Sequence, residues 1–413
     1  MTSSIDQDIV VDHYPATGRS MRIAYVTETY PPEVNGVAMS TARLVAGLHD
    51  RHHDIQLIRP RQDGSDAAQA GPRLHEVFVR GWPIPRYPHL RMGAPSKRAL
   101  IRLWSVQRPD VVHVATEGPL CWSALQAAAH LKLPTSSDFR TNFHAYSKHY
   151  GVGWLYRPIM AYLRKFHNRT QCTMVPTEGL RRELQVCGFD RLSVVARGVD
   201  TDKFDPAHRS DLLRQEWGAG PEDVVLLVVG RVAAEKNLQV LLDAFDQLRR
   251  VESRARLVIV GDGPMRAALQ ASAPHVHFAG QRVGLELATH YASADLFAFP
   301  SLTETFGNVT AEAMASGLPV VAFDYAAAAL LIRTGDNGFL VPFGDAAAFV
   351  RVVGELARAV ERRRAVGRQA RLTATAYGWD AVVTKFEAVL RAVIQDHAPA
   401  VRGVPAGATP RSH

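Results

Sequence analysis

Residues 224–245, VVLLVVGRVAAEKNLQVLLDAF, contain the pattern that decides the fold. The continuous apolar run Val224–Val229 predicts a strand that is buried on both faces. A loop with Arg231 and Lys236 follows, and the stretch Leu238–Arg250 then repeats apolar residues at helical spacing. A doubly buried strand followed by a helix is typical of a parallel sheet with helices on both sides.

The same alternation continues on either side of this stretch. Strands are expected at residues 22–26, 55–59, 74–79, 111–114, 135–139, 172–175 and 193–196, and again at 256–260, 276–279, 295–299, 319–323 and 338–341. A charged, proline-containing segment after Arg197 separates the two series. We therefore expect an α/β fold with two doubly wound Rossmann-like domains that face a central cleft.

The length of 413 residues also favours two domains, because single cores stop growing near roughly 250–300 residues. The expected units are a tail at 1–20, a first domain at 21–197, a second domain at 198–376, a helix packing back at 377–395 and a tail at 396–413.

Cysteine content and hydropathy restrict the class of protein. The 3 cysteines form no CxxC pair, which argues against a disulfide framework or a structural zinc site. No apolar run approaches the roughly 18 residues of a spanning helix, and the polar start MTSSIDQD lacks signal-peptide character. These features predict a cytoplasmic protein without a membrane span.

The net charge of +8 indicates an acidic partner. Nucleic acid, an anionic membrane surface and a phosphorylated substrate all fit that charge. No Walker-type loop is present and no GxGxxG follows the first strand, which weighs against kinase-like and nicotinamide-dependent enzymes. Arg231 and Lys236, beside a helix start at a strand's carboxyl end, instead suit a diphosphate, although a solvated salt bridge with Glu235 is the alternative.

The segment 295–323, DLFAFPSLTETFGNVTAEAMASGLPVVAF, carries two further candidates. Glu304 lies in a loop after a predicted strand, and Glu312 lies in the helix that follows. We expect Asn308 to cap that helix and both carboxylates to face one crevice, where they could bind sugar or ribose hydroxyls. Alternatively, Glu312 is only a favourable acid in a first helical turn.

These motifs together resemble the retaining glycosyltransferases of family 4, which have the GT-B fold. The resemblance rests on the Glu304–Glu312 pair, on GRVAAEKN at 230–237, on GDGPMR at 261–266 and on PPEVNGVA at 31–38. It runs from about Met21 to the last helix. It implies a nucleotide-sugar donor as substrate, lying mostly against the second domain, and neither a cofactor nor a metal ion.

The resemblance also implies a role for each matching residue. Arg231 and Lys236 would bind the diphosphate, Glu304 would contact the sugar and Glu312 would hold the ribose hydroxyls. The other implied donor contacts are the backbone N–H groups of Phe306 and Gly307, the helix start at Asn308, Gly36 closing over the diphosphate from the first domain, and Gly261, Gly263, Arg282 and Val283 near the base.

One position departs from the family pattern. Many relatives carry a histidine that touches the donor sugar, whereas the segment SSDFRTNFHAY at 136–146 has Arg140 there. Arg140 could neutralise phosphate charge in the cleft, and His144 is close enough in sequence to substitute.

Two basic segments of the first domain, 80–109 and 139–177, contain no acidic residue. The part from Trp154 to His167 predicts an amphipathic basic helix that lies on anionic lipid headgroups with aromatic residues at the interface. A solvated helix face with core aromatics is the alternative. No nucleic-acid-binding module is present, so no nucleic-acid partner is expected.

We therefore expect a metal-independent retaining hexosyltransferase at the inner face of the plasma membrane, with a lipid or glycan acceptor. The resemblance favours bacterial GDP-mannose-dependent α-mannosyltransferases. Transferases of glucosyl, glucuronosyl or sulfoquinovosyl groups from UDP-sugars remain an alternative. An alternative of another class is a non-catalytic module that binds a nucleotide or a polyanion.

Overall fold

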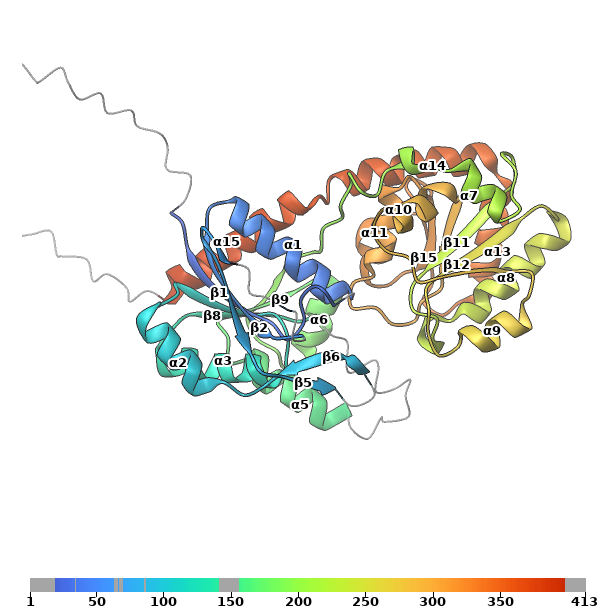
Figure 1. Cartoon of the computed structure of the whole chain (residues 1–413). Helices are drawn as coiled ribbons and strands as arrows, with labels where there is room; N and C mark the ends of the chain where they lie inside the picture. The colour runs from blue at the N-terminus through green and yellow to red at the C-terminus, as the bar shows by residue number, and fades with distance from the viewer. Residues whose placement is uncertain are drawn as a thin grey trace, which may run out of the picture.

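The computed structural model describes residues 19–33, 35–62, 66, 70–84, 87–140 and 156–397. Within them the chain forms two α/β domains, each built on its own parallel sheet (Figure 1). This confirms the predicted fold class. Most of the two expected tails, and His144, lie outside the described residues.

The first sheet has the strand order β10-β9-β8-β7-β1-β2-β4-β3. Every neighbouring pair is parallel except β3 with β4. The strands are β1 (Arg22–Val26), β2 (Asp54–Pro60), β3 (Ala70–Gly71), β4 (Leu74–Val79), β7 (Val111–Val114), β8 (Thr135–Asp138), β9 (Cys172–Val175) and β10 (Leu192–Val194).

Helices cover both faces of this sheet because alternate residues of its strands are apolar on each side. Ile23 and Tyr25 of β1 pack with one face, and Ala24 and Val26 pack with the other. The helices are α1 (Gly36–Asp50), α2 (Lys97–Val106), α3 (Pro119–His130), α5 (Tyr156–His167) and α6 (Glu178–Val186). A separate antiparallel hairpin, β5 (Gly81–Ile84) with β6 (Tyr87–Gly93), was not expected from the sequence.

The second sheet is entirely parallel and has the order β13-β12-β11-β14-β15-β16, the order of a doubly wound dinucleotide-binding fold. Its strands are β11 (Val225–Val229), β12 (Arg256–Val260), β13 (His277–Gly280), β14 (Leu296–Phe299), β15 (Val320–Phe323) and β16 (Phe339–Val341). Its helices are η2 (Pro206–His208), α7 (Asp211–Glu216), η3 (Ala234–Lys236), α8 (Leu238–Val251), α9 (Arg266–Ser272), α10 (Gly284–Ser293), α11 (Asn308–Ala315), α12 (Ala326–Leu331), α13 (Ala346–Arg358) and α14 (Val360–Thr375).

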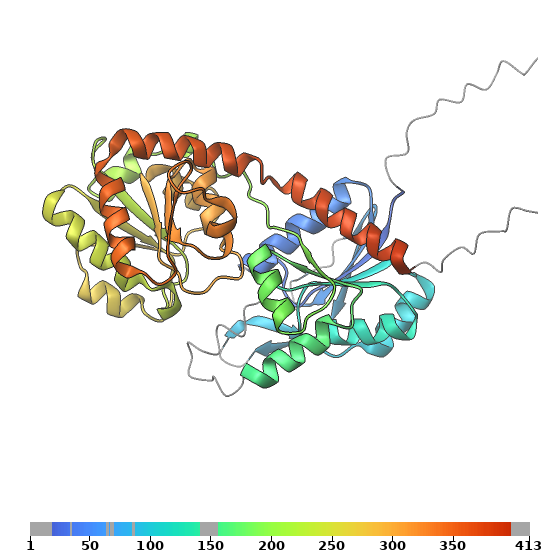
Figure 2. The same cartoon turned by 180° about the vertical axis from the view of Figure 1, so that it is seen from behind.

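The last helix, α15 (Trp379–His397), follows α14 and returns to the first domain (Figures 1 and 2). Its apolar residues Val382, Phe386 and Leu390 are buried on the first sheet. A Cβ on Gly47 would lie 2.5 Å from Val383 Cγ2, so glycine allows α1 and α15 to approach closely.

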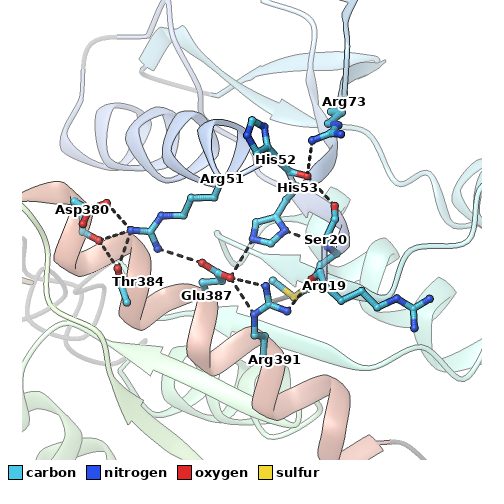
Figure 3. Close-up of polar contacts among 11 residues, drawn as sticks. Arg19, Ser20, Arg51, His52, His53, Arg73, Asp380, Thr384, Glu387 and Arg391 are labelled. Carbon is cyan, nitrogen blue, oxygen red and sulfur yellow. Dashed lines mark hydrogen bonds and ion pairs between the residues drawn. The ribbon is translucent and has the colours of Figure 1, made fainter. Parts of the chain in front are cut away.

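Polar side chains hold α15 along its flank (Figure 3). Arg51 donates to Glu387 Oε2 at 3.1 Å and to Thr384 Oγ1 at 2.7 Å. Glu387 Oε1 also accepts from Arg391 Nε at 2.9 Å and lies 3.3 Å from Nε2 of the buried His53. One carboxylate thus joins three basic side chains at the contact between the first domain and the end of the chain.

The two passages of chain between the domains meet. Val199 N–H donates to the Tyr377 carbonyl at 3.1 Å, and Val199 pairs with Gly378 as an isolated parallel bridge. A Cβ on Gly198 would lie 2.8 Å from Trp379 Cδ2, which leaves room only for glycine.

Among the described helices, none is both long and apolar enough to cross a lipid bilayer.

Candidate active site

A cleft of 790 Å³ opens between the domains, at the carboxyl ends of β11, β12 and β14. Ligands of doubly wound sheets bind at this edge. The cleft brings together most of the residues singled out in the sequence: Gly36, Arg140, Arg231, Lys236, Gly261, Arg282, Glu304, Phe306, Gly307 and Asn308.

Lys236 and Glu304 meet at the centre of the second domain's wall. Lys236 Nζ donates to Glu304 Oε1, and Ser301 Oγ donates to the same oxygen at 2.9 Å. Both side chains are largely buried, and Lys236 Nζ also lies 5.6 Å from the centroid of the Phe299 ring. The sequence offered no basic partner for Glu304, because its partner is 68 residues away along the chain.

Arg231 lies on the same wall and forms an ion pair with Glu235. The expected alternative of a salt bridge to Glu235 is therefore present, but Glu235 is buried rather than solvated. Burial raises the pKa of Glu235, but the hydrogen bond from Arg231, a backbone hydrogen bond and the charges of Arg231 and Lys236 together outweigh it, so the pKa is lowered overall. Arg231 itself is about one-third exposed at the cleft, where its planar fork suits a phosphate.

The helix α11 begins at the cleft, but not with the cap expected from the sequence. Gly307, with φ of 90°, is the N-cap residue, and Asn308 is the first helical residue. The prediction of Asn308 as the cap was wrong, because the left-handed turn needed here favours glycine. No side chain caps this helix, so its first N–H groups face the cleft and suit an anion.

The first domain approaches α11 through the start of α1. A Cβ on Gly36 would lie 3.5 Å from Asn308 Nδ2. The α1 helix itself is capped by Asn35, whose Oδ1 accepts from the N–H groups of Val37 and Ala38. Of the two helix starts, α11 therefore keeps more donors for a ligand.

Two glycines have a structural reason to be glycine. A Cβ on Gly261 would lie 1.9 Å from the Gly230 carbonyl oxygen, and one on Gly263 would lie 2.4 Å from the Val232 carbonyl oxygen. Both permit the loops after β11 and β12 to touch. Gly261 lines the cleft, whereas Gly263 lies outside the lining residues.

Glu312 also lies outside the cleft lining, on α11. The expectation that both carboxylates face the crevice thus fits Glu304 and does not fit Glu312. Glu312 Oε2 accepts from Tyr291 Oη at 2.9 Å. Burial raises the pKa of Glu312, while the Tyr291 bond and the charge of Lys203 act in the opposite direction.

Of the neighbouring residues Arg282 and Val283, only Arg282 belongs to the cleft wall. Arg282 lines the cleft and pairs with Glu286 at 3.1 Å. Val283 is the N-cap residue of α10 and is half-exposed, but it does not line the cleft.

Arg140 lies on the first domain's side of the cleft and is 7% exposed. Its Nε donates to Asp138 Oδ2 at 2.6 Å, and its buried Nη1 has no hydrogen-bond partner within the described residues. Asp138 Oδ2 also lies 3.4 Å from Nε2 of the buried His113. One carboxylate therefore serves two basic groups.

Sequence reasoning missed a second arginine on the first domain's side of the cleft, Arg197. Its Nη2 donates to the Arg140 carbonyl at 3.4 Å. Burial and repulsion from Arg140 lower the pKa of Arg197 to about 9, against the attraction of Asp138 and Glu304. The only signal was its position after the last predicted strand of the first domain.

Comparisons with known proteins match the segments of the chain that form the two sides of the cleft. Residues 34–203 match the model described as "Glycosyltransferase Family 4", and residues 223–359 match the model described as "Glycosyl transferases group 1". A GDP-mannose-dependent alpha-mannosyltransferase of Mycobacterium tuberculosis is 34% identical over 377 residues, which cover 89% of this chain and 97% of the relative. The chain belongs to glycosyltransferase family 4.

Other relatives of this family-4 glycosyltransferase are described with the same or with a different donor sugar. The protein of the same description from Mycolicibacterium smegmatis is 35% identical, over 90% of this chain and 98% of the relative. The sulfoquinovosyl transferase SQD2 of Arabidopsis thaliana is 32% identical, over 88% of this chain and 72% of the relative. Membership of the family therefore leaves the donor sugar open.

Solved structures share the fold at low identity. Sucrose-phosphate synthase from Thermosynechococcus elongatus has a TM-score of 0.73 at 17% identity, covering 91% of this chain and 100% of that chain. Anabaena HepE in complex with UDP and glucose has a TM-score of 0.70 at 16% identity, covering 90% and 100%. These likenesses confirm the predicted GT-B fold.

The described parts of the basic segments of this family-4 glycosyltransferase include α2, α5 and the β5–β6 hairpin, on the first domain's lower side in Figure 1. Their exposed cations include Lys97, Arg98, Arg102, Arg157, Arg164 and Lys165. The aromatic residues divide into two groups. Trp104 and Phe166 are fully buried in the core, contrary to an interfacial role, whereas Trp82 and Tyr162 are more than 40% exposed.

Proposed function

We propose that this family-4 glycosyltransferase transfers a hexosyl group with retention, as α-mannosyl from GDP-mannose, to a hydroxyl of a lipid or glycan acceptor. The observation that carries the proposal is the single cleft that combines Arg231, Lys236, Glu304 and the uncapped start of α11. Mannose is supported by relatives named GDP-mannose-dependent alpha-mannosyltransferase at 33–35% identity.

In the proposed reaction the bond from the anomeric carbon to the diphosphate oxygen breaks, and the electron pair leaves with the diphosphate. Arg231, Lys236 and the α11 N-terminus stabilise the developing negative charge, each contributing several kcal/mol, about 3 by analogy with oxyanion sites. The acceptor oxygen bonds to the anomeric carbon from the same face, and its proton passes to the departing phosphate. Glu304 faces the sugar and is oriented by Lys236 and Ser301.

Metal independence is part of the proposal. The fixed cations and the helix start supply the positive charge that a leaving diphosphate requires.

A second candidate donor is a UDP-sugar with an acidic group. The pair of Arg140 and Arg197 favours it. Asp138 pairs with Arg140, whereas Arg197 has no carboxylate within ion-pair distance among the described residues, so the two guanidinium groups could bind a further carboxylate or sulfonate. A relative at 32% identity is named sulfoquinovosyl transferase.

The donor is tested by incubating the purified chain with a bacterial lipid extract and GDP-mannose, UDP-glucose, UDP-glucuronate or UDP-sulfoquinovose in turn. We expect a mannosylated product by mass spectrometry, with an α linkage by NMR, formed equally with and without EDTA. Product from UDP-glucuronate or UDP-sulfoquinovose alone would select the second candidate, and product from UDP-glucose alone would contradict both candidates. A β linkage would overturn retention, and loss of product in EDTA would overturn metal independence.

The substitution Lys236→Ala tests the site itself. It should lower kcat by about 10²–10³-fold, because it removes one fixed cation from the leaving group. Lys385→Ala, which removes an exposed lysine of α15 outside the cleft lining, is the matched control and should keep wild-type turnover. Wild-type turnover in a folded Lys236→Ala variant would contradict the site assignment.

We also propose that the basic side of the first domain binds an anionic membrane surface, where each nearby cation contributes about 1 kcal/mol. The double charge reversal Arg157→Glu/Lys165→Glu on α5 should reduce sedimentation with phosphatidylglycerol vesicles. Reversal of Arg250 and Arg351, exposed on the second domain, changes the net charge equally and should have little effect. Equal binding to phosphatidylcholine vesicles would contradict this proposal.

A further inference from the structure

A second cavity, of 720 Å³, lies at the amino ends of β11, β14 and β15. The active cleft lies at the carboxyl ends of strands in the same sheet, and the two share no lining residue. They therefore lie on opposite edges of the second domain's sheet. One wall of the second cavity is α14, which crosses that domain in Figures 1 and 2.

Five arginines line this cavity, and two of them have a structural task. Arg209 donates to the carbonyls of Ala292 and Ala294 and to Asp295 Oδ1. Arg371 donates to three carbonyls and to Asp205 Oδ2 at 2.6 Å. The remaining three, Arg363, Arg364 and Arg368, project from neighbouring positions of α14.

Arg363 is 7% exposed and has no carboxylate within ion-pair distance among the described residues. Its Nη1 donates to the Ala357 carbonyl. Burial lowers its pKa, and repulsion from Arg364 and from Arg214 adds to this, against the attraction of Asp295. Asp295 is already bonded to Arg214 at 2.9 Å, so it cannot serve Arg363 alone. A buried cation without its own counter-ion is costly unless an anion is supplied.

Two further features add donors at the same place. Ser316 lines the cavity at 3% exposure, and its Oγ has no hydrogen-bond partner within the described chain. Helix α14 begins at Val360, also in the lining, without a side-chain cap. The positive end of a helix favours an anion.

The acidic lining residues do not cancel this charge. Asp223 accepts from Gly220 N–H at 2.8 Å and lies 3.5 Å from Arg254 Nε. Asp295 serves Arg209 and Arg214, and Glu222 is exposed at the rim. Arg364 has only a partner at 3.5 Å, Glu361, and both side chains are more than half-exposed. The α14 arginines are therefore available to a ligand.

We infer that this cavity binds a soluble phosphorylated small molecule, at a site separate from the donor cleft. Arginine forks match phosphate oxygens, and Arg363 and Ser316 would gain the partners that they lack. The volume lies in the range of small-molecule sites, so it suits a sugar phosphate or a nucleotide better than inorganic phosphate alone. A concave site suits a soluble molecule better than the headgroups of a flat membrane.

The test is calorimetric titration of pyrophosphate into a Lys236→Ala background, in which binding at the donor cleft is weakened. Adding Arg364→Ala and Arg368→Ala, both at exposed positions, should weaken pyrophosphate binding about tenfold or more, because two charge-assisted contacts are lost. The matched control is Arg351→Ala/Arg362→Ala, which also removes two exposed arginines. Arg351 lies on α13 and Arg362 lies on α14 over the Phe339 ring, both outside the cavity, so their loss should change Kd by less than about twofold.

An unchanged Kd in the Arg364→Ala/Arg368→Ala variant would overturn the inference. So would an equal loss with Arg351→Ala/Arg362→Ala, which would reduce the effect to net charge. Binding to phosphatidylglycerol vesicles that depends on Arg364 and Arg368, without pyrophosphate binding, would also overturn it in favour of a lipid headgroup. The readout needs no turnover, so failure of the proposed transferase reaction would leave this test intact.

Discussion

Lys236 and Glu304 hold each other in position across the second domain's wall. Lys236 would neutralise the leaving diphosphate, and Glu304 would contact the sugar beside it. Because each restricts the side-chain rotamers of the other, their groups are oriented before the donor arrives, which lowers the reorganisation needed in the transition state.

Glu28, which is buried next to the start of α3, is a carboxylate with a shifted pKa. Its Oε1 accepts from Leu120 N–H at 2.8 Å, and its Oε2 accepts from Gly93 N–H. Burial nevertheless raises the pKa of Glu28 from 4.5 to about 7, because the backbone bonds offset only part of the cost of removing the charge from water.

This shift predicts that Glu28 makes the fold less stable as the pH rises. The folded state holds the proton more tightly than the unfolded state between pH 4.5 and about 7. Glu28 should therefore lower the free energy of unfolding by up to ~3 kcal/mol across that interval. Urea unfolding of wild type and Glu28→Gln at pH 5 and pH 8 measures the change in the free energy of unfolding with pH. Equal pH slopes for the two proteins would contradict it.

Sequence reasoning found the loop residues of the cleft because strand ends and glycine turns mark them. It could not find Arg197, because burial next to Arg140 is a tertiary property with no local pattern. It also could not pair Glu304 with Lys236. Glu312 shows a different limit of prediction from sequence. The motif identifies the residue, but it does not indicate that the carboxylate of Glu312 accepts a hydrogen bond from Tyr291.

At the scale of elements, apolar runs identified the buried strands closely. The predicted strands at 22–26, 74–79, 111–114 and 172–175 are β1, β4, β7 and β9. The β5–β6 hairpin escaped because Pro83 and Pro88 interrupt its pattern. Helix α14 escaped because charged residues surround much of it, and only packing on its neighbours reveals it.

The contacts of Glu387 on α15 give a prediction for the stability of this helix's packing on the first domain. Glu387→Ala should lower the free energy of unfolding by ~2 kcal/mol, because Arg51, His53 and Arg391 lose a shared, partly buried partner. Asp380→Ala is the control. It removes another acid that bonds Arg51 on the same helix, but that acid is 93% exposed, so the cost should stay below ~1 kcal/mol.

The effect of Glu387 should also depend on pH. Burial raises its pKa, but the bonds from Arg391 and Arg51 and the charges of His53 and Arg391 together outweigh this and lower it below 4.5. Its stabilisation is therefore complete above about pH 4.5 and is lost as the pH falls through the lowered value. Urea titrations at pH 7 and pH 3 should show a smaller difference between wild type and Glu387→Ala at the lower pH. An undiminished difference would contradict the ionic origin.

At the scale of the whole molecule, the two domains are linked by two passages that touch at Gly198 and Trp379. Gly198→Ala should displace Trp379, because its Cβ would lie 2.9 Å from Trp379 Cα, which cannot rotate away. We expect a lower Tm and a lower kcat/KM together, since the cleft needs both walls in place. Gly179→Ala on α6 is the control, because a Cβ there meets nothing within 4 Å. Equal Tm and turnover in both variants would contradict this role.

The bridge between Val199 and Gly378 has a mechanical consequence. Two interdomain segments without mutual contact would let one domain translate and twist against the other. Because the two segments are bridged at one place, they leave a single hinge. Opening and closing of the cleft would then be a rotation about that hinge, with α14 moving with the second domain and α15 with the first.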